Sequence, residues 1–135
     1  MAEATLIHAV QGVEGSKVLE CLEDPDREFV GATLLKLELL PQPTLPRRTR
    51  ELAFLEAFFS RVVAWEPATE ELLADALRDA SQVPLSAMDA IHVAAARRLK
   101  ADELVTGEKP GQPLHQVKGL RVRFLAARGT VAEDA

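Results

Sequence analysis

The stretch LSAMDAIHVAAA at residues 85–96, followed by LVT at residues 104–106, decides the fold class. A serine, Ser86, precedes an apolar, alanine-rich run, which is typical of a helix start, and we expect this helix to continue to about Lys100. The short apolar run that follows is ended by Gly107 and predicts a strand. A helix that leads directly into such a strand is the repeating unit of a parallel α/β sheet.

The same alternation of strands and helices continues on both sides of this stretch. A leucine-rich helix opens at Thr33 and ends at Pro41, because a residue before proline avoids the helical region. Pro41, Pro43 and Pro46 predict a stiff connection to the next helix. We therefore expect a three-layer α/β fold in which a mostly parallel sheet is flanked by helices. The expected strands are Ala4–Val10, Glu28–Gly31, Val62–Trp65, Leu104–Thr106 and Leu120–Leu125, and the other expected helices are Ser16–Asp24, Arg47–Arg61 and one after Pro67 with its apolar face at Leu72, Leu73, Ala76, Leu77 and Ala80.

Length and composition limit the possible classes of protein. The 135 residues fit a single domain covering 1–135, and 47% apolar residues suffice to fill one core. The net charge of −5 argues against broad, non-specific nucleic-acid binding, which depends on neutralising phosphates. A single cysteine excludes an intrachain disulfide, and neither a signal peptide nor a membrane span is predicted. We expect a cytoplasmic protein that makes no contact with membranes.

Four carboxylates fall near predicted strand ends or helix starts, in largely apolar surroundings. They are Glu3, Glu38, Asp89 and Glu108. Ligands of open α/β sheets bind beyond the carboxyl ends of the strands, so these side chains are candidates for one shared site. Carboxylates in apolar surroundings are costly unless a charge neutralises them, and ligand sets made only of oxygen select hard cations. The pattern predicts a Mg²⁺ or Mn²⁺ site.

Each of these residues also fits an ordinary structural role. Asp89 follows Ser86 by three residues, as in an N-terminal capping pair whose charge the helix dipole favours. Glu38 fits the exposed face of an amphipathic helix, because its leucine neighbours in sequence do not share its face. Glu108 fits an exposed turn, and Glu3 fits an exposed chain end.

Four segments in the same order resemble the motifs of PIN-domain nucleases. ADELVTGEK at 101–109 resembles the end of the strand that carries their fourth acid, and residues 85–96 resemble the helix that carries the third. ATLLKLELL at 32–40 resembles the helix that carries the second acid, and AEATLI at 2–7 resembles the opening strand. The resemblance covers nearly the whole chain, and residues 85–109 are its most specific part.

The resemblance implies a metal-dependent endoribonuclease, of the kind that acts as the toxin in VapC-type toxin–antitoxin pairs. Its Mg²⁺ or Mn²⁺ would be held by the four acids, and the metal would activate a water for hydrolysis of RNA. The implied partners are an RNA substrate, a cognate antitoxin protein and a second copy of the chain in a homodimer. By the same resemblance the acids are supported by Thr5, Thr106 and Ser86.

Two departures from the family pattern support a second interpretation. Glu3 and Glu108 stand where the family has aspartate. Each side chain is one methylene longer than aspartate, which changes where its oxygens would meet a bound metal. Only Met1 and Ala2 precede Glu3, where the family has several apolar residues. The alternative is therefore a PIN-fold binding or regulatory protein with reduced or lost nuclease activity. An unrelated doubly wound domain is the third interpretation, although no phosphate-cradling glycine loop supports it.

A basic cluster, Arg47, Arg48 and Arg50, opens one of the predicted helices. Positive charge at a helix start opposes the helix dipole, so a stabilising role within the helix does not explain it. Contact with RNA phosphate or with an acidic partner is the functional interpretation, and solvated surface charge is the alternative.

Overall fold

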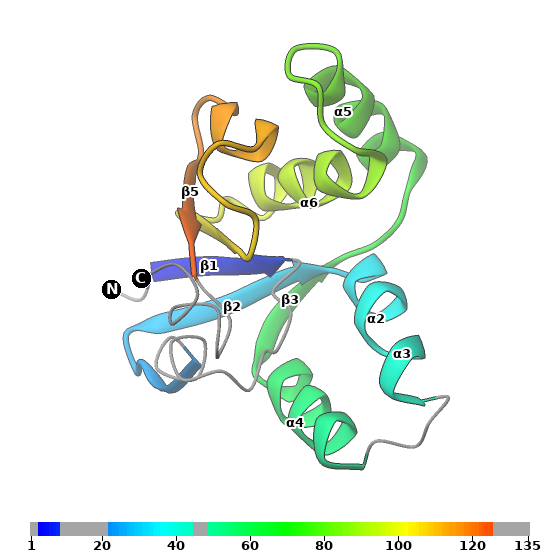
Figure 1. The fold of residues 1–135 in the computed structure, drawn as a ribbon, viewed down its shortest axis with the longest axis vertical. Helices are drawn as coiled ribbons and strands as arrows, with labels where there is room; N and C mark the ends of the chain where they lie inside the picture. Colours follow the sequence, from blue (N-terminus) through cyan, green and yellow to red (C-terminus); the bar gives the residue numbers. More distant parts are fainter. Residues whose placement is uncertain (1–2, 9–21, 45–48, 126–135) are drawn as a thin grey trace.

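A five-stranded parallel sheet organises this chain in the computed structural model, which describes residues 3–8, 22–44 and 49–125 (Figure 1). All pairings between neighbouring strands are parallel, in the order β3-β2-β1-β4-β5. The predicted α/β class is therefore confirmed. The strands are β1 (Glu3–His8), β2 (Arg27–Ala32), β3 (Val62–Glu66), β4 (Glu103–Thr106) and β5 (Arg121–Phe124).

Helices cover both faces of this sheet and complete the three predicted layers. In Figure 1, α5 and α6 lie on one side of the sheet, and α2, α3 and α4 lie on the other. Within the described residues, no helix is long and apolar enough to cross a membrane. The helices are α2 (Leu34–Leu39), α3 (Pro41–Thr44), α4 (Thr49–Ser60), α5 (Glu70–Ala80) and α6 (Ala87–Arg98), with a short 3₁₀ helix, η1, at Pro113–Gln116.

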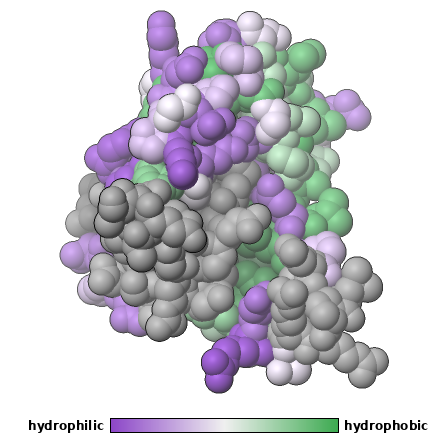
Figure 2. Space-filling view, in the orientation of Figure 1, coloured by the Kyte–Doolittle hydropathy of each residue, from purple (hydrophilic) through white to green (hydrophobic). Residues whose placement is uncertain are grey.

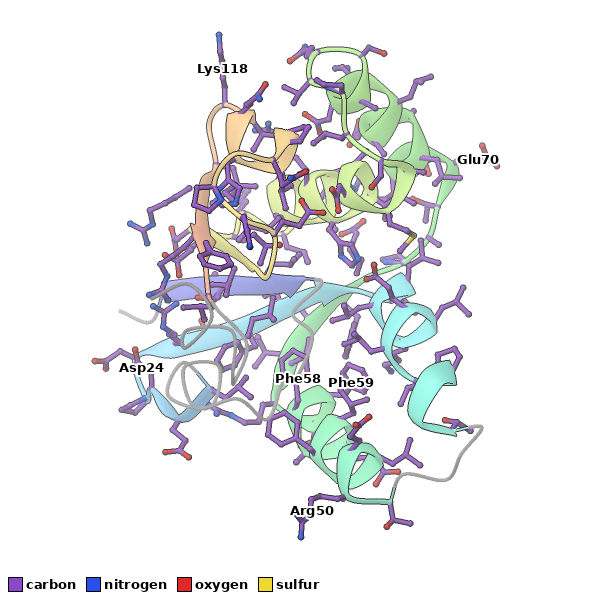
Figure 3. All side chains as sticks on the ribbon, in the orientation of Figure 1. Asp24, Arg50, Phe58, Phe59, Glu70 and Lys118 are labelled. Atoms are coloured by element: carbon purple, nitrogen blue, oxygen red, sulfur yellow. The ribbon has the colours of Figure 1, made fainter. Side chains whose placement is uncertain are left out.

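Two hydrophobic clusters form the core, one on each face of the sheet. Leu6 and Ile7 are adjacent in β1 and pack into different clusters, because successive side chains of a strand point to opposite faces. The cluster under α5 and α6 includes four alanines of α6, whose small side chains let this helix approach the sheet closely. The cluster under α2 and α4 contains aromatic as well as aliphatic side chains, and Phe58 points from α4 toward the sheet (Figure 3). β1 is thus buried from both sides.

Proline-containing segments are more regular than the sequence analysis predicted. Pro41 does end α2, but the predicted stiff connection begins with a further helical turn, α3. Proline is tolerated in the first turn of a helix, where no backbone N–H is needed. The N–H of Thr44 donates to the carbonyl of Leu40 at 3.1 Å, and its hydroxyl donates to the same oxygen at 2.6 Å. Pro113 opens η1 in the same way, and this element was not predicted.

The predicted apolar face of α5 is only half buried. Leu72 and Ala76 are in the core, whereas 44% of Leu73 and 69% of Leu77 are exposed. The part of α5 that packs in the core is therefore narrower than the apolar face predicted from its sequence. The leucines outside that part form apolar surface.

A buried carboxylate at the start of β4 ties neighbouring strands together. Glu103 is only 3% exposed. It accepts hydrogen bonds from Arg27 Nη1 of β2 at 2.7 Å and from Arg121 Nε of β5 at 3.1 Å, and Arg123 Nη2 lies 3.3 Å away. Arg27 Nη1 also donates to the Thr5 hydroxyl of β1 at 2.9 Å. Neutralising a buried carboxylate with several guanidinium groups makes its burial tolerable.

Replacing this carboxylate should destabilise the fold. We expect Glu103→Ala to lower the free energy of unfolding by about 3 kcal/mol, the low end for a broken buried ion pair, because Arg121 and Arg123 keep contact with water. Urea denaturation followed by circular dichroism measures the change. Glu28→Ala, which removes an exposed carboxylate from β2, is the control and should have little effect. Equal losses of unfolding free energy in both variants would show that the ion pairs of Glu103 stabilise the fold no more than an exposed carboxylate does.

Candidate functional site

Glu38 and His92 form a hydrogen-bonded pair that joins α2 to α6. Glu38 lies near the end of α2, which follows the carboxyl end of β2 (Figure 1), and its side chain is 25% exposed. Its Oε1 lies 2.9 Å from Nε2 of His92, a side chain with no exposed surface. Because a carboxylate oxygen accepts hydrogen bonds, Nε2 carries the proton and donates.

Asp89 lies one turn before His92 in the first turn of α6. Residues three apart on a helix are neighbours on its surface, so Asp89 and His92 lie on the same side of α6. Asp89 is only 9% exposed, and its backbone N–H donates to Ser86 Oγ at 3.2 Å. The cap predicted at Ser86 is therefore present, with the backbone N–H of Asp89 as its donor.

Glu108 has a backbone anchored from two directions just beyond β4. Its N–H donates to the hydroxyl of the buried Thr106 at 3.1 Å. His115 Nε2 donates to its carbonyl oxygen at 2.7 Å. Thr106 thus positions the start of this loop, as a supporting residue would, and His115 is a second support that the sequence analysis missed.

Glu3 and Thr5 lie toward the opposite end of β1. Glu3 pairs with Arg27 at the beginning of β2, whereas His8, at the carboxyl end of β1, pairs with Thr106. His8 follows Glu3 by five residue steps along the strand, which corresponds to roughly 16 Å. Thr5 is fully buried, and its hydroxyl accepts from Arg27 beside Glu103. The structure therefore does not bring the backbone of Glu3 or the side chain of Thr5 to Glu38 and Asp89. The cause is the register of β1, whose carboxyl end is His8.

The predicted basic cluster is separate from these acids where the structure describes it. Arg47 and Arg48 fall outside the described residues. Arg50 is exposed in the first turn of α4, and Figure 3 shows it projecting from the end of that helix, away from α6. Arg50 thus has no contact with the Glu38–His92 pair.

The local chemistry is that of the Glu38 carboxylate hydrogen-bonded to the buried imidazole of His92, with Asp89 one turn before that imidazole on α6. Among the residues that the structure describes, no group of three or more histidine, cysteine, aspartate or glutamate side chains could hold a metal ion. Two carboxylates still fit Mg²⁺, which keeps several waters and commonly takes one or two protein carboxylates together with phosphate oxygens. Glu38 and Asp89 are thus the residues that suit such an ion.

Comparison with known proteins adds no identification. No family model matches the chain, and no curated protein matches it either. The functional interpretation therefore depends on the geometry around Glu38 and Asp89 and on the sequence motifs that contain them.

The Ser86 cap should contribute to stability. We expect Ser86→Ala to lower the free energy of unfolding by about 1 kcal/mol, because the N–H of Asp89 loses its acceptor. Thr69→Ala is a matched variant, since the Thr69 hydroxyl accepts from the N–H of Leu72 at 3.1 Å at the start of α5. Thermal denaturation of both variants measures the losses, which should be similar. An unchanged melting temperature for Ser86→Ala alone would contradict the capping role.

Proposed function

We propose that this chain is a metal-dependent endoribonuclease of the PIN type that acts as the toxin of a toxin–antitoxin pair in the cytoplasm. The observation that carries the proposal is the hydrogen bond between Glu38 and His92. It connects the motif at 32–40 to the motif at 85–96, which are more than 40 residues apart in sequence. Both motifs resemble those of PIN nucleases, and this hydrogen bond joins them at α2, which follows the carboxyl end of β2, the end of a strand beyond which ligands of α/β folds bind.

Glu38 and Asp89 are the proposed ligands of Mg²⁺ or Mn²⁺. A bound ion would lower the pKa of a water molecule and stabilise charge on the scissile phosphate. Other residues hold these proposed ligands in place. Ser86 caps the first turn of α6, which carries Asp89, and His92 orients Glu38. Thr106 and His115 hold the backbone of Glu108 beyond β4, so that its side chain extends from a fixed loop.

Partner proteins are also part of the proposal, namely an antitoxin and a second copy of the chain. Figure 2 shows apolar residues gathered along the side of the molecule where α5 and α2 lie. Leu77 of α5 and Leu37 of α2 are 69% and 68% exposed. A groove of about 520 Å³ beside α2 and α3 is lined mainly by apolar side chains, including Leu34, Leu37 and Leu40. Exposed apolar surface of this kind supports a partner-binding role.

A second candidate function is a binding or regulatory protein that keeps the fold but has reduced or lost nuclease activity. The placement of Glu3 favours it, since the backbone of this residue begins β1 at the end of the strand remote from Glu38. The glutamates at positions 3 and 108 favour it as well, because their longer side chains shift the ligand oxygens away from the positions that aspartate would give.

Cleavage of RNA distinguishes the two candidates. In the presence of Mn²⁺ we expect the wild-type chain to cleave single-stranded RNA, and we expect Asp89→Asn to be slower by about 100-fold or more. The reason is that a catalytic ion contributes several kcal/mol and each 1.36 kcal/mol is tenfold in rate. The measurement is the initial rate of cleavage of a labelled RNA, with and without excess chelator.

The control for this experiment is Asp26→Asn. It makes the same chemical change at an exposed residue just before the amino end of β2, whereas Glu38 follows the carboxyl end of that strand. It should cleave at the wild-type rate. No cleavage by the wild type, together with retained binding of RNA or of a protein partner, would favour the second candidate. Equal rates for the wild type and Asp89→Asn would contradict an active site at Asp89.

A further inference from the structure

We propose that His92 is a positioning residue that sets the direction of the Glu38 carboxylate and thereby the affinity of the site for divalent metal. This inference rests on the proposed function, because it concerns how the proposed metal ligands are held. His92 is not among the four metal ligands expected from the sequence. Its role follows from its burial and from its contact with Glu38.

The position of His92 is fixed by its surroundings. It lies in the second turn of α6, within a run of buried residues that continues through Val93, Ala94 and Ala95. The backbone of α6 packs closely on the sheet, so the imidazole has a defined location and no exposed surface. Buried polar groups in folded proteins are hydrogen-bonded, and Glu38 supplies the acceptor for Nε2.

Glu38 is less constrained by its own helix. α2 has only six residues, Glu38 is the fifth, and its side chain is a quarter exposed. A glutamate has several rotatable bonds, so the direction of its carboxylate depends on the contacts that it makes. The hydrogen bond from His92 fixes Oε1 and with it the plane of the carboxylate. The same bond holds that carboxylate against His92, which lies one helical turn from Asp89, the other proposed ligand.

Donors of this kind are known to matter for metal sites in general. Carboxylates that bind metals are usually held by hydrogen bonds from residues that do not touch the ion, and losing such a partner typically weakens metal binding about 10–100-fold. The donor, rather than the imidazole ring itself, is the essential feature. A side chain that keeps an N–H donor at similar reach should therefore preserve binding.

Mn²⁺ titration of the full-length chain by isothermal calorimetry tests this inference. We expect His92→Leu, which is apolar and of similar size, to bind Mn²⁺ about 10–100-fold more weakly than wild type. His92→Gln keeps a donor and should bind close to wild type. Val93→Ala is the matched control, because it disturbs the adjacent buried position of α6 without removing a contact to Glu38, and it should keep wild-type affinity despite lower stability.

A double mutant shows whether His92 acts through Glu38. In the Glu38→Gln background, adding His92→Leu should weaken Mn²⁺ binding no further, because the carboxylate that His92 positions is already absent. The RNA-cleavage rate of His92→Leu should return toward wild type as Mn²⁺ is raised, which a purely structural defect would not do. An equal loss of affinity in both backgrounds, or wild-type affinity of His92→Leu, would overturn the inference while leaving the proposed function intact. A wild-type chain that binds no Mn²⁺ would overturn both.

Discussion

The hydrogen bond between Glu38 and His92 is the interaction on which the functional interpretation depends. α2 belongs to the layer on one face of the sheet and α6 to the layer on the other, and their core residues fall into different clusters. The bond therefore connects the two layers beyond the strand ends, where side chains from both can meet. It also joins α2 to the helix that carries Asp89.

The order and type of most elements could be predicted from the sequence, because they depend on local signals. Ser86 before an alanine-rich run marks the start of α6, and Gly107 marks the end of β4, close to where the structure has them. The helix at Pro41–Thr44 was missed because proline in a first turn and proline in a loop have the same local signature.

The candidate site was predictable only in part, because contacts between distant residues depend on strand order and register. The contact of Glu38 with His92 was not predicted, although the spacing of three between His92 and Asp89 was a usable signal. Glu103 is paired with Arg27, 76 residues away, and no sequence pattern predicts that contact. The position of Glu3 depends on which residue of β1 lies level with Thr106, and only the pairing with β4 determines it.

Arginines at the end of α6 form ion pairs that hold elements together. Arg98 donates to Glu66 of β3 and to Asp75 of α5. The hydrogen bond to Glu66 has the larger effect, and together the two bonds raise the pKa of Arg98 above its usual value. Arg97 binds Asp79 similarly. Arg97 and Arg98, which the sequence alone would suggest are basic surface, therefore hold α6 against its neighbours. Overall charge is thus a poor guide to where an anionic ligand would bind.

The two outer strands of the sheet suggest how the chain avoids aggregation. An outer strand exposes unpaired backbone groups that can recruit a strand from another molecule. In β5 the guanidinium groups of Arg121 and Arg123 are drawn inward to Glu103, and such inward charges would be buried unfavourably by an incoming strand. In β3 the register with β2 shifts between Phe29 and Val30, so that Val63 is an extra residue that bends the strand. Each border of the sheet thus carries its own barrier to forming intermolecular fibrils.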